Sequence, residues 1–108
     1  QHVDVLAELG PERTRLAPRA YHQLLLRLAR ARRQDAESGV SPQEQGWLYA
    51  DRVAEELSIS RAKLNVDIFR ARKQIADLGV RGAARGIERR PQTQQLRLGV
   101  PELVFEEP

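Results

Sequence analysis

The sequence predicts one small α+β domain, in which three helices pack with short strands near both ends of the chain. Three observations support this class. Apolar residues recur at helical spacing over residues 61–78, they alternate with charged residues over 3–9, and Gly and Pro separate such segments. With 108 residues, of which 41% are hydrophobic and 31% charged, the chain can build one core.

The N-terminal residues are expected to form a strand or a hairpin. Val3, Val5 and Ala7 alternate with acidic residues, as in a half-buried strand. Turn-forming residues follow at 10–12, and residues 14–16 can return as a second strand.

The first helix is predicted to begin at Pro18, because the fixed φ of proline and its missing N–H suit a first helical turn. The apolar side chains that follow the spacing of an amphipathic helix are Tyr21, Leu24, Leu25 and Leu28. The helix is expected to run to about Ser38, with Gly39 as its stop.

Residues 47–49 form a short apolar stretch, which is either extended or the lead into a second helix. Trp47 is expected to be buried against the first helix. The second helix is short, with Asp51 in its first turn and Val53 paired with Leu57 at i, i+4.

The third helix has the most regular pattern. It is predicted to run from Arg61 to about Leu78, with Ser60 as its N-cap after a turn at 58–60 and Gly79 as its stop. Its apolar stripe is Leu64, Ile68, Ala71, Ile75 and Leu78.

Two further strands are predicted at residues 87–90 and 94–98, joined over Pro91-Gln92-Thr93 and preceded by a loop with a helical turn at 80–86. Helix, short helix, tight turn, long basic helix and β-hairpin is the order of a winged helix-turn-helix. In that fold the long helix is held out from a small core, so that it can enter a major groove about 12 Å wide.

The expected organisation is an N-terminal strand or hairpin over 1–16, a winged helix-turn-helix core over 17–99 and a C-terminal tail over 100–108. Residues 103–105 can add a strand edge to this domain. The absence of Met suggests a fragment of a longer protein, and the longest apolar run is far shorter than the roughly 20 residues of a membrane span. We expect a cytoplasmic domain that has no membrane partner.

The charge pattern suggests a polyanionic partner. The net charge is +3, and the pI is about 9.9. Residues 13–33 hold seven Arg and no acid, residues 34–60 hold six acids against one Arg, and residues 61–97 hold ten bases against three acids. Such blocks predict a polarised surface, although solvated helix faces in an Arg-rich chain are the alternative.

The sequence contains no motif that predicts a catalytic site or a metal site. There is no Cys, and His2 and His22 lack the spacing of metal ligands. No Ser, His and Asp grouping and no Gly-rich phosphate loop is present. We therefore expect no enzyme, no cofactor and no metal.

Two family resemblances point to the same fold. Residues 66–75, VDIFRARKQI, resemble the recognition-helix motif V-x-I-x-R-L-R-x-K-L of OmpR-type response-regulator DNA-binding domains. Residues 16–21 resemble that family's L-T-P-x-E-[FY] entry to helix one, and Ile87, Arg97 and Leu98 resemble the ends of its wing. This resemblance covers roughly residues 3–99 and implies DNA binding.

The second resemblance is to the C-terminal regions of bacterial forkhead-associated-domain proteins, and we prefer this family. The residues that carry it are 21–26 (YHQLLL), 45–47 (QGW) and 88–91 (ERRP). It implies a signalling protein in which a phosphopeptide-binding domain precedes Gln1.

The candidate site is the outward face of the helix over 61–78 together with the hairpin. Val66 and Phe69 could touch thymine methyl groups or anchor a protein partner, and Phe69 could instead lean on the hairpin or helix one. Arg72 could reach a phosphate or pair with acidic residues of 51–56. The predicted DNA contacts are Lys63, Asn65, Val66, Phe69, Arg70, Arg72, Lys73, Arg89, Arg90 and Arg97.

Two functions follow from this site. The first is the DNA-binding domain of a bacterial transcriptional regulator or signalling protein, with the helix in the major groove and the hairpin arginines on the backbone. The alternative is a winged-helix protein-interaction module of a phospho-signalling protein, which does not bind DNA and uses Val66 and Phe69.

Overall fold

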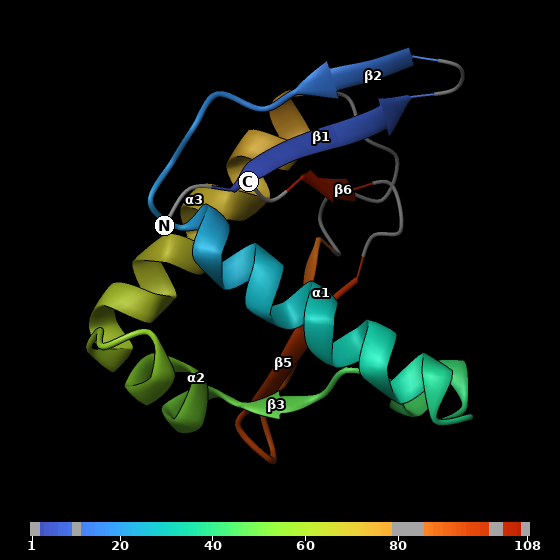
Figure 1. The fold of residues 1–108 in the computed structure, drawn as a ribbon. Coiled ribbons are helices and arrows are strands. Elements are labelled where there is room, and N and C mark those ends of the chain that lie inside the picture. The colour runs from blue at the N-terminus through green and yellow to red at the C-terminus, as the bar shows by residue number, and fades with distance from the viewer. Residues whose placement is uncertain (1–2, 10–11, 79–85, 100–102, 107–108) are drawn as a thin grey trace.

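The computed structural model describes residues 3–9, 12–78, 86–99 and 103–106. Within these ranges, three α-helices and two small antiparallel sheets form an α+β fold (Figure 1). The helices are α1 (His22–Glu37), α2 (Ala50–Glu56) and α3 (Arg61–Asp77), with a short 3-10 turn, η1 (Pro42–Glu44). The strands are β1 (Asp4–Leu9), β2 (Glu12–Arg15), β3 (Leu48–Tyr49), β4 (Ile87–Arg90), β5 (Gln95–Leu98) and β6 (Leu103–Glu106).

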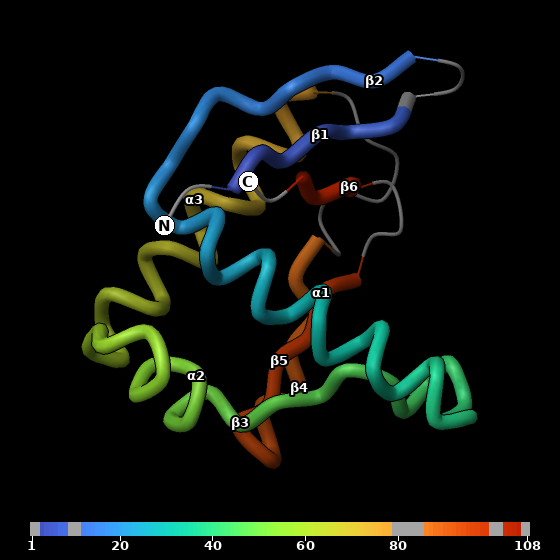
Figure 2. The backbone as a smooth tube through the Cα atoms, viewed as in Figure 1, coloured from blue at the N-terminus to red at the C-terminus, as the bar shows by residue number. Residues whose placement is uncertain are grey.

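The first sheet joins the two ends of the chain in the order β2-β1-β6. The alternation over residues 3–9 is confirmed as a strand, with Val5 and Ala7 fully buried in the core. The strand edge expected at residues 103–105 of the C-terminal tail is confirmed as β6, which pairs antiparallel with β1 so that Leu103 lies opposite Ala7. Figure 2 shows the blue N-terminal strands and the red β6 side by side.

The second sheet has the order β3-β5-β4 and contains the predicted hairpin. In the turn between its two long strands, Gln94 takes a positive φ of 57°. Ile87, Leu96 and Leu98 face the core, because the hairpin packs its apolar side against the helices. The short β3 confirms the extended reading of residues 47–49 and leads directly into α2.

Helix α1 begins at His22, four residues later than the sequence suggested. The reason is a tertiary contact, since Gln74 of α3 donates its Nε2 hydrogen to the carbonyl of Ala17 at 2.9 Å. This contact and the backbone bond from Leu16 N to Val5 O keep residues 16–19 out of the helix. The predicted stop is confirmed, because Gly39 follows the helix with a φ of 82°.

Helices α2 and α3 meet across the predicted turn at 58–60. Ser60 caps α3 as expected, with its Oγ accepting from the Lys63 N–H at 3.0 Å. The predicted stripe of α3 is buried in the same core cluster as the leucines of α1, except that Leu78 is only partly buried. Gly79 and residues 80–85 lie outside the described residues.

Trp47 is not a core residue, and the expectation that it packs in the core is wrong. Its half-buried ring lies between the guanidinium groups of Arg90, 4.1 Å from the ring centre, and Arg97, 4.6 Å away. The indole N–H donates to the carbonyl of Gln43 at 3.0 Å. The two cations on the ring and the backbone acceptor of the indole N–H stabilise Trp47 in this polar setting.

Candidate nucleic-acid interface

Helix α3 presents an apolar ridge on the side that faces away from the core. This ridge consists of Val66, 42% exposed, and Phe69, 69% exposed. The two residues are three positions apart on the helix, so their side chains are neighbours. Neither the hairpin nor α1 covers the Phe69 side chain. The outward direction that helical periodicity predicted for Val66 and Phe69 is therefore confirmed.

A basic flank borders the ridge on the side of α1. Its cations are Arg19, Lys63, Arg70 and Lys73, and they line a groove of about 430 Å³ together with Tyr21 and Gln74. Two carboxylates reduce the charge here, since Lys63 pairs with Asp67 at 2.5 Å and Lys73 with Asp77 at 3.6 Å. Arg70 makes no ion pair or hydrogen bond with the residues that the structure describes, so its guanidinium can meet a ligand.

A second basic flank borders the ridge on the side of the hairpin, and it consists of Arg61, Arg72 and Arg89. Arg89 of β4 donates to the Asn65 side chain of α3 at 2.7 Å. Arg61 pairs with the exposed Asp51 at 2.6 Å and donates to Gln94 at 3.2 Å. Burial lowers the pKa of Arg89, and the nearby charges of Arg72 and Arg61 lower it further. The three guanidinium groups therefore form one positive region.

Two predicted contact residues have their guanidinium groups engaged within the fold: Arg97 is buried, and Arg72 adds its charge to the hairpin flank but is bonded to the backbone. Arg97 is only 9% exposed and donates to the carbonyls of Pro42, Gln43 and Gln45 and to Glu88. It is therefore an internal residue and not a surface contact. Arg72 donates through Nε and Nη2 to the carbonyl of Ile87, so it fastens β4 to α3 and uses neither of the partners expected for it.

The described contacts of Arg90 are with residues 43–47 and not with the α3 ridge. Its guanidinium stacks on Trp47 and pairs with Glu44 of η1 at 3.1 Å. Sequence reasoning missed Arg19 and Arg61 as members of the two flanks. The position of Arg61 could have been predicted from the sequence. Arg61 directly follows the cap Ser60, and the helical period places it on the same side of the helix as Arg72.

No family model, curated protein or solved structure matches this chain.

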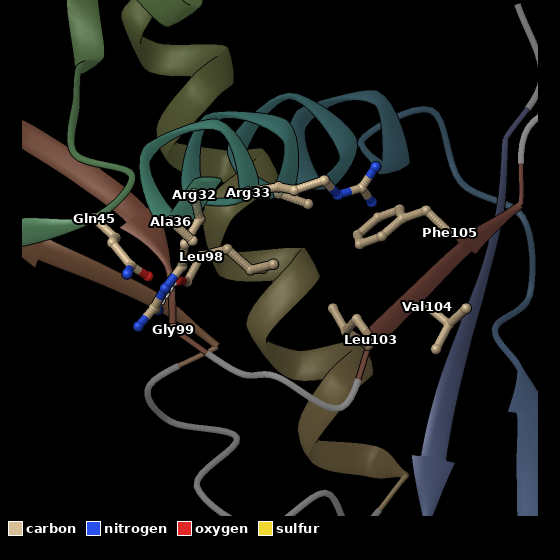
Figure 3. A pocket seen from close by; sticks show the side chains of 10 residues that line it. Arg32, Arg33, Ala36, Gln45, Leu98, Gly99, Leu103, Val104 and Phe105 are labelled. Carbon is tan, nitrogen blue, oxygen red and sulfur yellow. Dashed lines mark hydrogen bonds between the residues drawn. The ribbon is translucent and has the colours of Figure 1, made fainter. Parts of the chain in front are cut away.

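Another hollow, of about 490 Å³, lies between α1, the end of β5 and β6 (Figure 3). Leu98, Leu103 and Phe105 give it an apolar character, and Arg32 donates to the Leu98 carbonyl at 2.6 Å. Burial lowers the pKa of Arg32. Its described lining has no carboxylate, histidine or hydroxyl group, so it offers neither a nucleophile nor an acid–base pair.

In the described part of the chain, no group of three or more His, Cys, Asp or Glu side chains could hold a metal ion. Nor do the described helices include one with the length and apolar character that crossing a bilayer demands.

Proposed function

We propose that this domain binds duplex DNA as a winged helix-turn-helix, with α3 as the recognition helix and the β4–β5 hairpin as the wing. The observation that carries the proposal is the pair of basic flanks on opposite sides of the α3 ridge. A major groove is about 12 Å wide and has a phosphate backbone on each side. A helix that enters it needs cations along both of its sides.

The ridge and Arg70 supply groups that can read bases. Val66 and Phe69 are exposed apolar side chains of the kind that contacts thymine methyl groups. The guanidinium N–H groups of Arg70 have no acceptor among the described residues, and they fit the two acceptors of guanine in the major groove. We place the domain in a cytoplasmic transcriptional regulator or signalling protein of a bacterium.

A protein partner is the second candidate function, and the exposure of Phe69 favours it. A phenylalanine that is 69% exposed next to a second apolar side chain resembles the anchor of a small protein interface. The carboxylates of Asp67 and Asp77 also offset the charges of Lys63 and Lys73 on α3, which leaves less positive charge for DNA.

A titration of the domain with random-sequence duplex at two salt concentrations tests the proposal. Phosphate neutralisation makes the affinity fall steeply as salt rises, with a slope of about −0.9 per phosphate contact. Phe69→Ala serves as the contrasting variant, because it should weaken duplex binding modestly but abolish binding of a protein partner. If the wild type shows no salt-sensitive binding to any duplex, the DNA proposal fails and the ridge becomes a protein-binding site.

A further inference from the structure

A small cavity lies in the seam between the start of α3 and the hairpin. Its volume is about 110 Å³, and its polar lining residues are Arg61, Arg89, Arg90, Gln94 and Gln95. Such a cavity exceeds the space that one water needs, yet it is well below the roughly 300–1,000 Å³ of a site for an organic ligand. Its size suits a small polyatomic ion or group.

Arg61, which lines this cavity, also has a buried hydrogen-bond donor without an acceptor among the described residues. The Nε of Arg61 is buried and has no partner among the described residues, while the two Nη atoms are engaged by Asp51 and Gln94. Buried donors in native proteins almost always have a partner, and an unpaired one points to a bound water or ion. A negatively charged acceptor fits a guanidinium N–H best.

The positive charge around the cavity is only partly compensated. Arg90 has a carboxylate partner in Glu44 and Arg61 has one in Asp51, whereas the bond from Arg89 goes to the neutral side chain of Asn65. None of the described lining residues is acidic. Burial and the charges of Arg72 and Arg61 lower the pKa of Arg89, which indicates the repulsion that an anion would relieve.

We infer that this cavity binds one phosphate group, supplied by the backbone of bound duplex DNA. The inference rests on the proposed function, and it names the residues that hold one phosphate on the hairpin flank. The oxygens of the phosphate accept hydrogen bonds from the guanidinium groups of Arg61 and Arg89, which line the cavity. Asn65 then orients Arg89 at the junction of the hairpin and the recognition helix.

Two measurements test the inference on the intact domain. The first follows the Nε–H resonance of Arg61 by nuclear magnetic resonance during titration with inorganic phosphate and with duplex, with Arg61→Lys to assign the signal. We expect a saturable shift with both ligands. The second measures duplex affinity against salt for Arg61→Gln and Arg89→Gln. Each should lower the salt slope by about 0.9 and weaken binding about tenfold near 0.1 M salt.

Arg13→Gln is the matched control, because it removes the same charge from an exposed pair with Glu8 on β2. It should leave the salt slope unchanged. Arg89→Lys keeps the charge and should recover most of the slope, which separates a phosphate contact from a defect in folding; the thermal unfolding midpoint of each variant checks the fold.

The outcomes distinguish the two proposals. If the wild type binds duplex with a steep salt slope, but both Gln variants behave as Arg13→Gln and the Arg61 resonance does not move, the phosphate site is wrong and DNA binding stands. If the wild type binds no duplex, the inference that the DNA backbone supplies the phosphate is wrong. A saturable shift of Arg61 with inorganic phosphate alone would then support a site for free phosphate.

Discussion

Nε2 of His22 in α1 lies 2.8 Å from Oε1 of Gln74 in α3. The amide of Gln74 is oriented by its other end, because its Nε2 donates to the carbonyl of Ala17. Oε1 also accepts from the Tyr21 hydroxyl at 2.9 Å. Because Oε1 of Gln74 can only accept hydrogen bonds, Nε2 of His22 must donate to it. The neutral imidazole of His22 therefore carries its proton on Nε2.

This relationship predicts that acid destabilises the domain. His22 is 2% exposed, and burial lowers its pKa below the ordinary value of 6.5. Between the two pKa values the unfolded chain binds more protons than the folded one, so the free energy of unfolding decreases as the pH falls below about 6.5. Urea unfolding of the wild type at about pH 7.5 and about pH 5.5 should show this decrease.

His22→Gln removes the titrating group and should flatten the part of the pH dependence that lies near neutrality. His2→Gln is the control, since His2 is the other histidine of the chain. The explanation is wrong if His22→Gln keeps the pH dependence of the wild type.

Arg97→Ala should destabilise the fold strongly. The guanidinium of Arg97 satisfies the carbonyls of Pro42, Gln43 and Gln45 from the inside, and its loss leaves them and Glu88 without this partner. Breaking a buried charged network typically costs about 3–5 kcal/mol. The exposed pair of Arg13 and Glu8 is the comparison, and Arg13→Ala should cost less than about 1 kcal/mol. Equal urea midpoints for the two variants would contradict this assignment.

Trp47→Ala should lower stability by an intermediate amount. The ring is half-buried between two guanidinium groups, so we expect a loss of about 2 kcal/mol, less than the roughly 3–5 kcal/mol of a fully buried Trp. Trp47→Phe retains an aromatic face and loses the bond to Gln43, so its thermal midpoint should lie between those of Trp47→Ala and the wild type. An unchanged midpoint for Trp47→Ala would show that this stacking contributes nothing.

Two glycines with similar backbone angles should respond differently to alanine. Gly46 has a φ of 79°, and an added Cβ would lie 2.9 Å from Cβ of Arg32. Gly39 has a φ of 82° with nothing within 4 Å of such a Cβ. Gly39→Ala therefore incurs only the backbone strain, about 1–2 kcal/mol, whereas Gly46→Ala adds a steric clash with α1. Thermal unfolding should rank Gly46→Ala as the less stable variant, and the reverse order would refute the argument.

The proposed binding of α3 to DNA predicts different effects for two substitutions on this helix. Arg70→Ala should weaken binding to the preferred site by about 1–3 kcal/mol and relax the preference at one base, because a bidentate base contact is lost. Lys73→Ala should weaken binding to all sequences alike, since a phosphate contact carries no sequence information. Selection of bound sequences from a random duplex pool distinguishes the two; identical base preferences for the wild type and Arg70→Ala would remove Arg70 from base recognition.

Sequence patterns predicted the elements whose causes are local. The stripe of α3, the cap at Ser60 and the alternation at residues 3–9 all depend on neighbours within one or two turns or on one strand. The start of α1 escaped prediction, because proline favours a first turn locally while Gln74, far along the chain, bonds to Ala17. Helical periodicity likewise placed Val66 and Phe69 on the outside.

The arginines were harder to place for the same physical reason. Arg97 and Arg72 donate to main-chain carbonyls, and every residue in the sequence carries such an acceptor. Which carbonyls are left without a partner depends on the folded backbone alone. The half-buried position of Trp47 depends on its contacts with Arg90 and Arg97, so the sequence did not predict it either.

The pairing of β6 with β1 sets the order in which the domain can be completed during synthesis. Leu103 meets Ala7 across almost the whole length of the chain. The helices and the β4–β5 hairpin are translated before β6, so they can pack while β1 still has an open edge toward its missing neighbour. Closing so long a loop is slow relative to local helix formation. The nascent chain therefore exposes one open edge of β1 until β6 leaves the ribosome.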